Sequence, residues 1–159
     1  MKRGVLLDTS FFLRLYNIED PLHENAKGYY KYFLESEFTL KISTIAIAEF
    51  CVKGSLSDLP MKNLQVVPFN LDHAVRAGEL INFVRLEKES RGVIITQRLI
   101  IPNDTKMFAQ ADLEHDIESF ISSDNEAVKI HSLLSGNMDI RFSYIDISVP
   151  HTNVYGELF

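Results

Sequence analysis

The sequence predicts an α/β fold with three layers, in which helices cover both faces of a central, mainly parallel sheet. Two observations lead to this prediction. Short apolar segments of strand length alternate with longer amphipathic segments of helix length along the chain. Acidic residues also follow some of the apolar segments, at the point where a strand would end. Because no internal repeat or long Gly, Ser or Pro linker interrupts this alternation, residues 1–159 are expected to form a single domain.

The first half of the chain alternates between the two kinds of segment. In order, the sequence predicts a strand at 5–7, a helix from about residue 10, a helix at 21–35, a strand at 40–42, a helix at 44–52 and a strand at 66–67. In the helix at 21–35, the aromatic side chains Tyr29, Tyr30 and Phe33 lie at helical spacing. Thr44 is in position to cap the helix that follows the second strand.

The second half of the chain continues the pattern after a long helix. In order, the sequence predicts helices at 72–88 and about 104–115, a strand at 120–121, a helix at 125–134 and a strand at 140–149. The apolar positions Val75, Leu80 and Val84 give the first of these helices an amphipathic face. The segment 92–101 is β-branched and apolar, and its pattern assigns it neither an element nor a role.

Composition excludes several classes of protein. The chain is 46% hydrophobic and 24% charged, which is typical of a globular domain and not of a disordered or fibrous chain. Its single cysteine cannot form an internal disulfide, and no stretch of 18 apolar residues is present to span a membrane, so a cytoplasmic location is expected. The 16 Lys and Arg against 22 Asp and Glu give a net charge of −6, which disfavours nucleic-acid binding by broad electrostatic attraction.

Two candidate site residues are acids that follow predicted strands. Asp8 comes directly after the strand at 5–7, and Asp124 comes shortly after the strand at 120–121. Ligands of parallel α/β sheets bind beyond the carboxyl ends of the strands, where both carboxylates would lie. Each acid also precedes a predicted helix, so an ordinary capping role remains an alternative for both.

Two further candidates are acids on predicted helices. Glu49 shares a helical face with Ile45 and Val52, where an unpaired carboxylate is costly. The alternative is a position at the rim of that face, with Lys53 as a partner. Asp104 also faces the apolar side of its helix, although acids are favoured in the first turn of any helix. Two acids further along are expected to be solvated or to support the site only indirectly: Asp112 and Asp116.

The four candidate acids together predict a divalent-cation site. A parallel sheet could gather Asp8, Glu49, Asp104 and Asp124 at one edge, where their like charges would repel one another without a cation. Oxygen ligands select Mg²⁺ or Mn²⁺ over zinc, and the histidines show no paired ligand spacing. Phosphate-binding loops of the GxxxxGK[ST] and GxGxxG types and a GxSxG nucleophile elbow are also missing.

Four short segments resemble the PIN domain family of small α/β nucleases, which includes the toxin halves of VapC-type toxin–antitoxin pairs. The segments are VLLDTS at 5–10, ISTIAIAEF at 42–50, PND at 102–104 and ISSD at 121–124. Their order and spacing are similar to those of the family over nearly the whole chain. The resemblance implies that Asp8, Glu49, Asp104 and Asp124 are the catalytic and metal-binding residues. It also implies that Thr9 and Ser122 carry hydroxyls that orient carboxylates or water.

The same resemblance implies an activity and partners. The family hydrolyses phosphodiester bonds, usually of RNA, with Mg²⁺ or Mn²⁺, and its compact members are often homodimers that a small antitoxin protein holds inactive. Two alternatives remain open: a non-catalytic PIN-like binding or regulatory module, and a structure-specific DNA nuclease that uses the same pocket. Three cations close in sequence to the acids are available for phosphates, namely Arg14, Lys53 and Lys106. Lys106 occupies a stretch where the family usually has small apolar residues.

Overall fold

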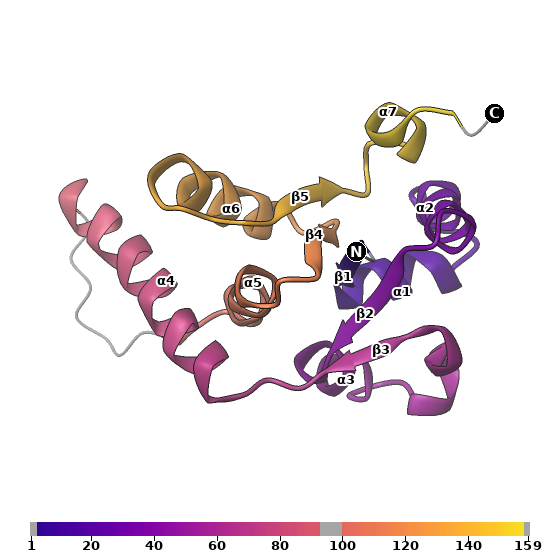
Figure 1. Ribbon diagram of the computed structural model, residues 1–159, viewed down its shortest axis with the longest axis horizontal. Helices are drawn as coiled ribbons and strands as arrows, with labels where there is room; N and C mark the ends of the chain where they lie inside the picture. Colours follow the sequence, from indigo (N-terminus) through magenta and orange to yellow (C-terminus); the bar gives the residue numbers. More distant parts are fainter. Residues whose placement is uncertain (1–2, 93–99, 158–159) are drawn as a thin grey trace.

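A five-stranded sheet forms the centre of the computed structural model, which describes residues 3–92 and 100–157 (Figure 1). All strand pairs are parallel, and the strand order is β3-β2-β1-β4-β5. The strands are β1 (Gly4–Leu7), β2 (Thr39–Ser43), β3 (Gln65–Val67), β4 (Ile117–Ser122) and β5 (Ser143–Asp146). This architecture confirms the predicted three-layer α/β fold.

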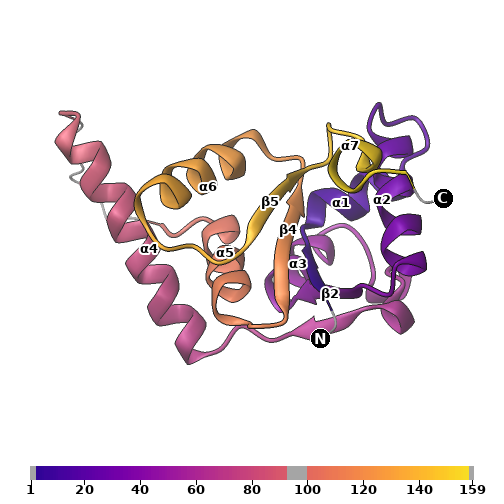
Figure 2. The same cartoon turned by 45° about the horizontal axis from the view of Figure 1, so that its top comes forward.

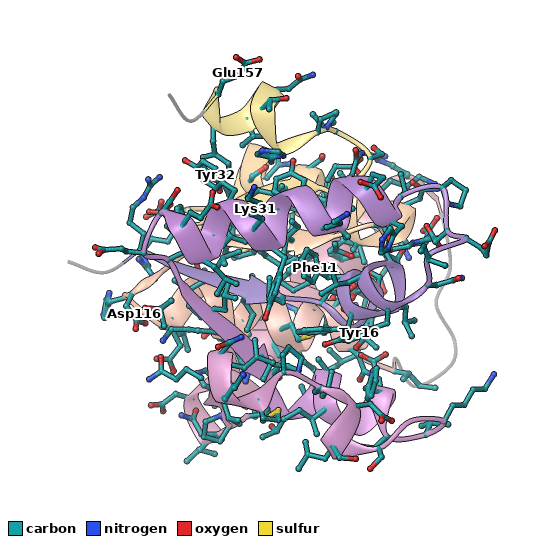
Figure 3. All side chains as sticks on the ribbon, turned by 90° about the vertical axis from the view of Figure 1, so that its right-hand side faces the viewer. Phe11, Tyr16, Lys31, Tyr32, Asp116 and Glu157 are labelled. Carbon is teal, nitrogen blue, oxygen red and sulfur yellow. The ribbon has the colours of Figure 1, made fainter. Side chains whose placement is uncertain are left out.

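Helices cover both faces of the sheet. They are α1 (Thr9–Tyr16), α2 (His23–Glu35), α3 (Thr44–Phe50), α4 (Leu71–Ser90), α5 (Asn103–Leu113), α6 (Asn125–Asn137) and α7 (His151–Tyr155), with short 3₁₀ turns at Leu56–Asp58 and Met61–Asn63. Helices α4, α5 and α6 contact one another on one side, and α1, α2 and α7 form a second group (Figure 2). Tyr32 on α2, which is labelled in Figure 3, stacks on Tyr155 with ring centroids 4.6 Å apart, and this contact attaches α7 to the second group.

The sheet reverses its direction of winding at β1. The chain passes from β1 outward to β2 and β3, and then returns across the sheet to β4 on the other side of β1. Leu7 is in register with both Ile42 and Ile121, so three strands end together at one edge. The residues that follow these ends therefore meet at the switch point, where open α/β sheets form their ligand crevice.

Burial on both faces explains why the central strand β1 carries no polar side chain. Every residue of β1 is buried, because helices lie on both of its faces.

At the opposite edge of the sheet, where the strands begin, the buried amine of Lys41 pairs with Asp116 at 2.6 Å; Asp116 is labelled in Figure 3. Gly4 is required here, since a Cβ would lie 2.3 Å from the carbonyl oxygen of Asp116.

Three sequence predictions on secondary structure need correction. The helix predicted at 44–52 ends at Phe50, and its cap is Ser43, whose hydroxyl accepts from the Ile45 amide at 3.0 Å, so Thr44 is not the cap. The strand predicted at 140–149 is only four residues long, because a turn closes after Asp146, with the Ser148 amide donating to its side chain. Helix α7 was not predicted. The unassigned segment 92–101 lies mostly outside the described residues.

Across residues 3–92 and 100–157, no helix combines the length and the apolar character that crossing a bilayer requires. The longest of these helices, α4, carries charged residues along much of its length.

Candidate active site

One pocket at the switch point is lined by all four candidate acids. It has a volume of about 350 Å³ and lies where α1, α3, α5 and the β4–α6 connection approach one another. Its lining residues are Asp8, Thr9, Ser10, Leu13, Glu49, Asn103, Asp104 and Asp124. The tertiary structure thus brings together carboxylates that are up to 116 positions apart in the sequence (124 − 8 = 116).

Asp8 is the most firmly held of the four. Its buried carboxylate caps α1 by accepting from the Thr9 amide at 2.7 Å. The hydroxyls of Ser10 and Ser122 donate to its other oxygen at 2.8 and 2.6 Å. The Ser122 hydroxyl also accepts from the Asp124 amide at 3.1 Å, so one side chain joins the ends of β1 and β4. The capping alternative therefore holds for Asp8, and it coexists with a position in the pocket.

Asp124 combines the same two features at the end of β4. Its Oδ1 caps α6 by accepting from the amides of Glu126 at 2.8 Å and Ala127 at 3.3 Å. The hydroxyl of Tyr144 on β5 donates to its backbone carbonyl at 3.2 Å. Beyond these two amides, no N–H or hydroxyl group of the described residues donates to its side chain, which lines the pocket beside Asp104.

Glu49 lies at the end of α3, and its predicted environment is wrong. Its side chain is exposed, and Val52 is 78% exposed, because the helix stops at Phe50 and no apolar face continues past it. Glu49 reaches the pocket instead through Thr9, whose hydroxyl donates to Oε1 at 3.2 Å. The alternative ion pair with Lys53 does not form among the described residues.

Asp104 faces inward from the first turn of α5, as its helical position predicts. The side chains that share its face, Met107, Phe108 and Ala111, are buried. Burial is the largest cause that raises the pKa of Asp104 from 3.8 to about 7. The negative charges of the other three acids and hydrogen bonding with Asp124 raise this pKa further. Burial, the neighbouring negative charges and the hydrogen bonding with Asp124 thus all favour the protonated form of Asp104.

The chemistry of this pocket fits a hard divalent cation. In the part of the chain that the structure describes, no Lys, Arg or His lies within 4.0 Å of any of the four carboxylates. Carboxylate oxygens without nitrogen or sulfur donors are the set that Mg²⁺ and Mn²⁺ prefer. Across residues 3–92 and 100–157, no three acidic, His or Cys side chains converge closely enough to enclose an ion. The pocket thus has the donor chemistry of such a site with an open arrangement of its side chains.

Comparison with known proteins identifies the fold. No family model and no curated protein sequence matches this chain. A chain of VapBC2 from Rickettsia felis bound to a promoter DNA fragment superposes with a TM-score of 0.55 and 20% identity, covering 90% of this chain and 98% of that chain. A chain of DNA-bound VapBC from Salmonella typhimurium gives 0.54 and 15%, covering 92% and 99%.

A third solved structure is Mycobacterium tuberculosis VapC20, described as a sarcin-ricin loop cleaving toxin. It gives a TM-score of 0.50 and 16% identity, covering 79% of this chain and 93% of that chain. The chain has a VapC-type PIN fold. The resemblance of the four sequence segments to PIN domains is thereby confirmed at the level of the fold.

Three residues that line the pocket of this PIN fold were not among the predicted site residues. They are Ser10, Leu13 and Asn103. Ser10 and Leu13 lie on the first turns of α1, directly after Asp8, and Asn103 precedes Asp104. Adjacency to a predicted site acid was the available signal for Ser10 and Asn103. Leu13 carried none, because an exposed leucine on an amphipathic helix has many ordinary explanations.

Proposed function

We propose that this protein is a divalent-metal-dependent endoribonuclease and the toxin of a toxin–antitoxin pair. The single observation that carries the proposal is the pocket in which Asp8, Glu49, Asp104 and Asp124 face one another with no protein cation beside them. This pocket lies at the switch point of a VapC-type fold, where a ligand crevice is expected. A cation-dependent hydrolase needs such an uncompensated set of oxygen donors.

The four carboxylates would hold one or two Mg²⁺ or Mn²⁺ ions, each ion contacting only one or two of them and keeping several water ligands, which suits the open arrangement of the side chains. When bound, the cation lowers the pKa of a coordinated water and stabilises negative charge on the scissile phosphate. Ser10 and Ser122 fix the orientation of the Asp8 carboxylate, and Thr9 does the same for Glu49. Asp104 or Asp124 would accept or orient the proton of the attacking water.

Partners are proposed on the same basis. VapC20, one of the three similar structures, is described as cleaving the sarcin-ricin loop, which is RNA. The other two are VapBC assemblies with DNA. By analogy we propose RNA as the substrate, a small antitoxin protein as the regulator, a homodimer as the assembly and the cytoplasm as the location.

The test is cleavage of a mixed single-stranded RNA with Mn²⁺, with EDTA, and with the variant Asp8→Asn. We expect cleavage with Mn²⁺ that EDTA abolishes and that Asp8→Asn lowers by about a hundredfold or more. The matched control is Glu126→Gln, which removes an exposed carboxylate two residues from Asp124 without altering the pocket lining.

The alternatives predict different results in this test. Cleavage that survives both EDTA and Asp8→Asn would contradict the proposed site. Absence of cleavage by the wild-type protein under every condition would support a non-catalytic module. Cleavage of a matched DNA substrate in place of RNA would support a DNA nuclease that uses the same pocket.

A further inference from the structure

The lysines of the described chain form two groups, those with a carboxylate partner and those without one. Lys27, Lys31, Lys41 and Lys129 each pair with a carboxylate. The remaining lysines of the described chain have no carboxylate within 4.0 Å: Lys53, Lys62, Lys88 and Lys106. A cation that the protein leaves uncompensated is available to an anion from outside.

Of these four lysines, Lys106 is bonded to the wall of the acidic pocket. It lies on α5 one turn after Asn103, and its amine donates to the side-chain carbonyl of Asn103 at 3.3 Å. Asn103 lines the pocket. The Lys106 ammonium therefore contacts a neutral acceptor that belongs to the pocket lining.

The other two cations that the sequence made available for phosphates are placed differently. The guanidinium of Arg14 is committed to Asp20, with an N···O distance of 2.6 Å, and it also donates to the Ser123 hydroxyl. Lys53 is exposed beyond the end of α3, and among the described residues its amine bonds to no group of the pocket lining. The structure thus selects Lys106 from the three candidates.

The direction in which Lys106 faces follows from its helix. Asn103, Lys106 and Gln110 share one side of α5 at three- and four-residue spacing. The Gln110 side-chain amide donates to the backbone carbonyl of Val67, the last residue of β3, at 3.0 Å. Lys106 therefore lies on the side of α5 that faces the carboxyl end of β3.

We propose that Lys106 binds a backbone phosphate of the RNA that flanks the bond to be cleaved, and that the RNA leaves the pocket over the carboxyl end of β3. This inference rests on the proposed function of the pocket. A phosphate oxygen is a charged acceptor, so the ammonium gains a charge-assisted hydrogen bond when it exchanges Asn103 for phosphate. A lysine contacts phosphate as a point charge, so the contact positions RNA without reading its bases.

The experiment compares Lys106→Gln, Lys106→Arg and the control Lys62→Gln in steady-state cleavage of single-stranded RNA with Mn²⁺ over a series of salt concentrations. Lys62 is equally unpaired, but it lies in the Met61–Asn63 turn and is not part of the acidic pocket. The control therefore makes the same change in net charge at a distant place. A second measurement records RNA binding by fluorescence anisotropy in an Asp8→Asn background.

A flanking phosphate contact exists equally in the ground state and the transition state, so it acts on KM and leaves kcat unchanged. For Lys106→Gln we expect KM to rise about fivefold. We also expect the slope of log(kcat/KM) against log[salt] to become less negative by about 0.7, the value for one phosphate contact on a single strand. Lys106→Arg should restore both quantities, and Lys62→Gln should change neither. The thermal shift with Mn²⁺ should be the same in all three variants.

The outcomes separate this inference from the proposed function. If the wild type cleaves RNA and Lys106→Gln behaves as Lys62→Gln does, the inference is overturned and the proposed function stands. A fall in kcat with KM unchanged would also overturn it. If nothing is cleaved but Lys106→Gln weakens RNA binding in the anisotropy measurement, the contact stands and the nuclease proposal fails. If RNA is neither cleaved nor bound, both fail.

Discussion

The two ends of α5 carry acids that the protein treats in opposite ways. Asp112, near the carboxyl end of the helix, is 8% exposed, and its side chain accepts from Arg76 at 2.9 Å and from the Arg141 amide at 2.8 Å. Beside it, buried His73 lies 2.9 Å from Glu114. Asp104, at the other end, faces three further carboxylates and no cation of the described chain.

This contrast distinguishes an acid that stabilises the fold from acids that are available for function. A buried charge that the protein neutralises itself contributes to one fixed packing, and its removal leaves the partner uncompensated. A cluster that is left uncompensated at an open pocket raises the free energy of the folded protein unless a proton or an external cation binds. The pair at Asp112 therefore has a structural role, and the cluster at Asp104 is the candidate for function.

The largest expected effect is that of replacing Asp112, near the carboxyl end of α5, whose charge Arg76 neutralises. Asp112→Asn should lower the free energy of unfolding by about 3 kcal/mol, because the Arg76 guanidinium loses its buried counter-charge and keeps only the exposed carboxylate of Glu79. Urea denaturation measures this change. The double variant Asp112→Asn/Arg76→Gln should recover part of the loss, and purely additive losses would show that the two residues do not form a coupled pair.

The second largest effect is the stabilisation by Mn²⁺ at the acidic pocket, near the amino end of α5. Mn²⁺ at a hundredfold excess over its Kd should raise the free energy of unfolding of the wild type by about 2.7 kcal/mol. Denaturation with and without Mn²⁺ measures the gain. Asp112→Asn should keep this gain, and Asp8→Asn should lose most of it. An equal gain in Asp8→Asn would place the bound ion elsewhere.

A smaller effect concerns pH without metal. The pKa of Asp104 is about 7 in the folded protein and 3.8 as its ordinary value, so the folded state binds the proton more tightly. Stability from this group is therefore present below about pH 4 and is lost as pH rises toward about 7. After allowance for solvent screening, Asp104→Asn should raise the free energy of unfolding at about pH 8 by roughly 1–2 kcal/mol.

The same variant supplies its own control at lower pH. At about pH 4, where Asp104 is protonated in the folded protein, Asp104→Asn and the wild type should have nearly equal stability. A gain of the same size at both pH values would mean that the carboxylate charge is not its cause.

The smallest effect tests how the pocket is held. Tyr144→Phe removes the hydroxyl that donates to the carbonyl of Asp124. We expect a loss of about 1 kcal/mol in the free energy of unfolding and a Mn²⁺ affinity that falls by about threefold. Isothermal titration measures the affinity. Tyr16→Phe, which removes a hydroxyl from a side chain that is 52% exposed, should change neither quantity.

The sequence predicted one of the two clusters and missed the other, for a physical reason. Asp8 and Asp124 follow apolar strands, and a strand end is a local signal. Asp112 was expected to be solvated or to support the site only indirectly, but it is buried, because Arg76, 36 positions earlier, compensates its charge. The apolar surroundings predicted for Glu49 failed for a different local reason, since the end of α3 depends on the turn that follows it.

The sequence by itself determined the alternation of strands and helices, the parallel sheet and the candidate acids, because hydrophobic periodicity and the residues at strand ends are local properties of the chain. Only the tertiary structure decided which charges meet. It separated the compensated acid from the uncompensated four, showed that Arg14 is already paired, and bonded Lys106 to Asn103 in the wall of the pocket. Electrostatic interactions depend on distances in space, and the strand order β3-β2-β1-β4-β5 sets those distances.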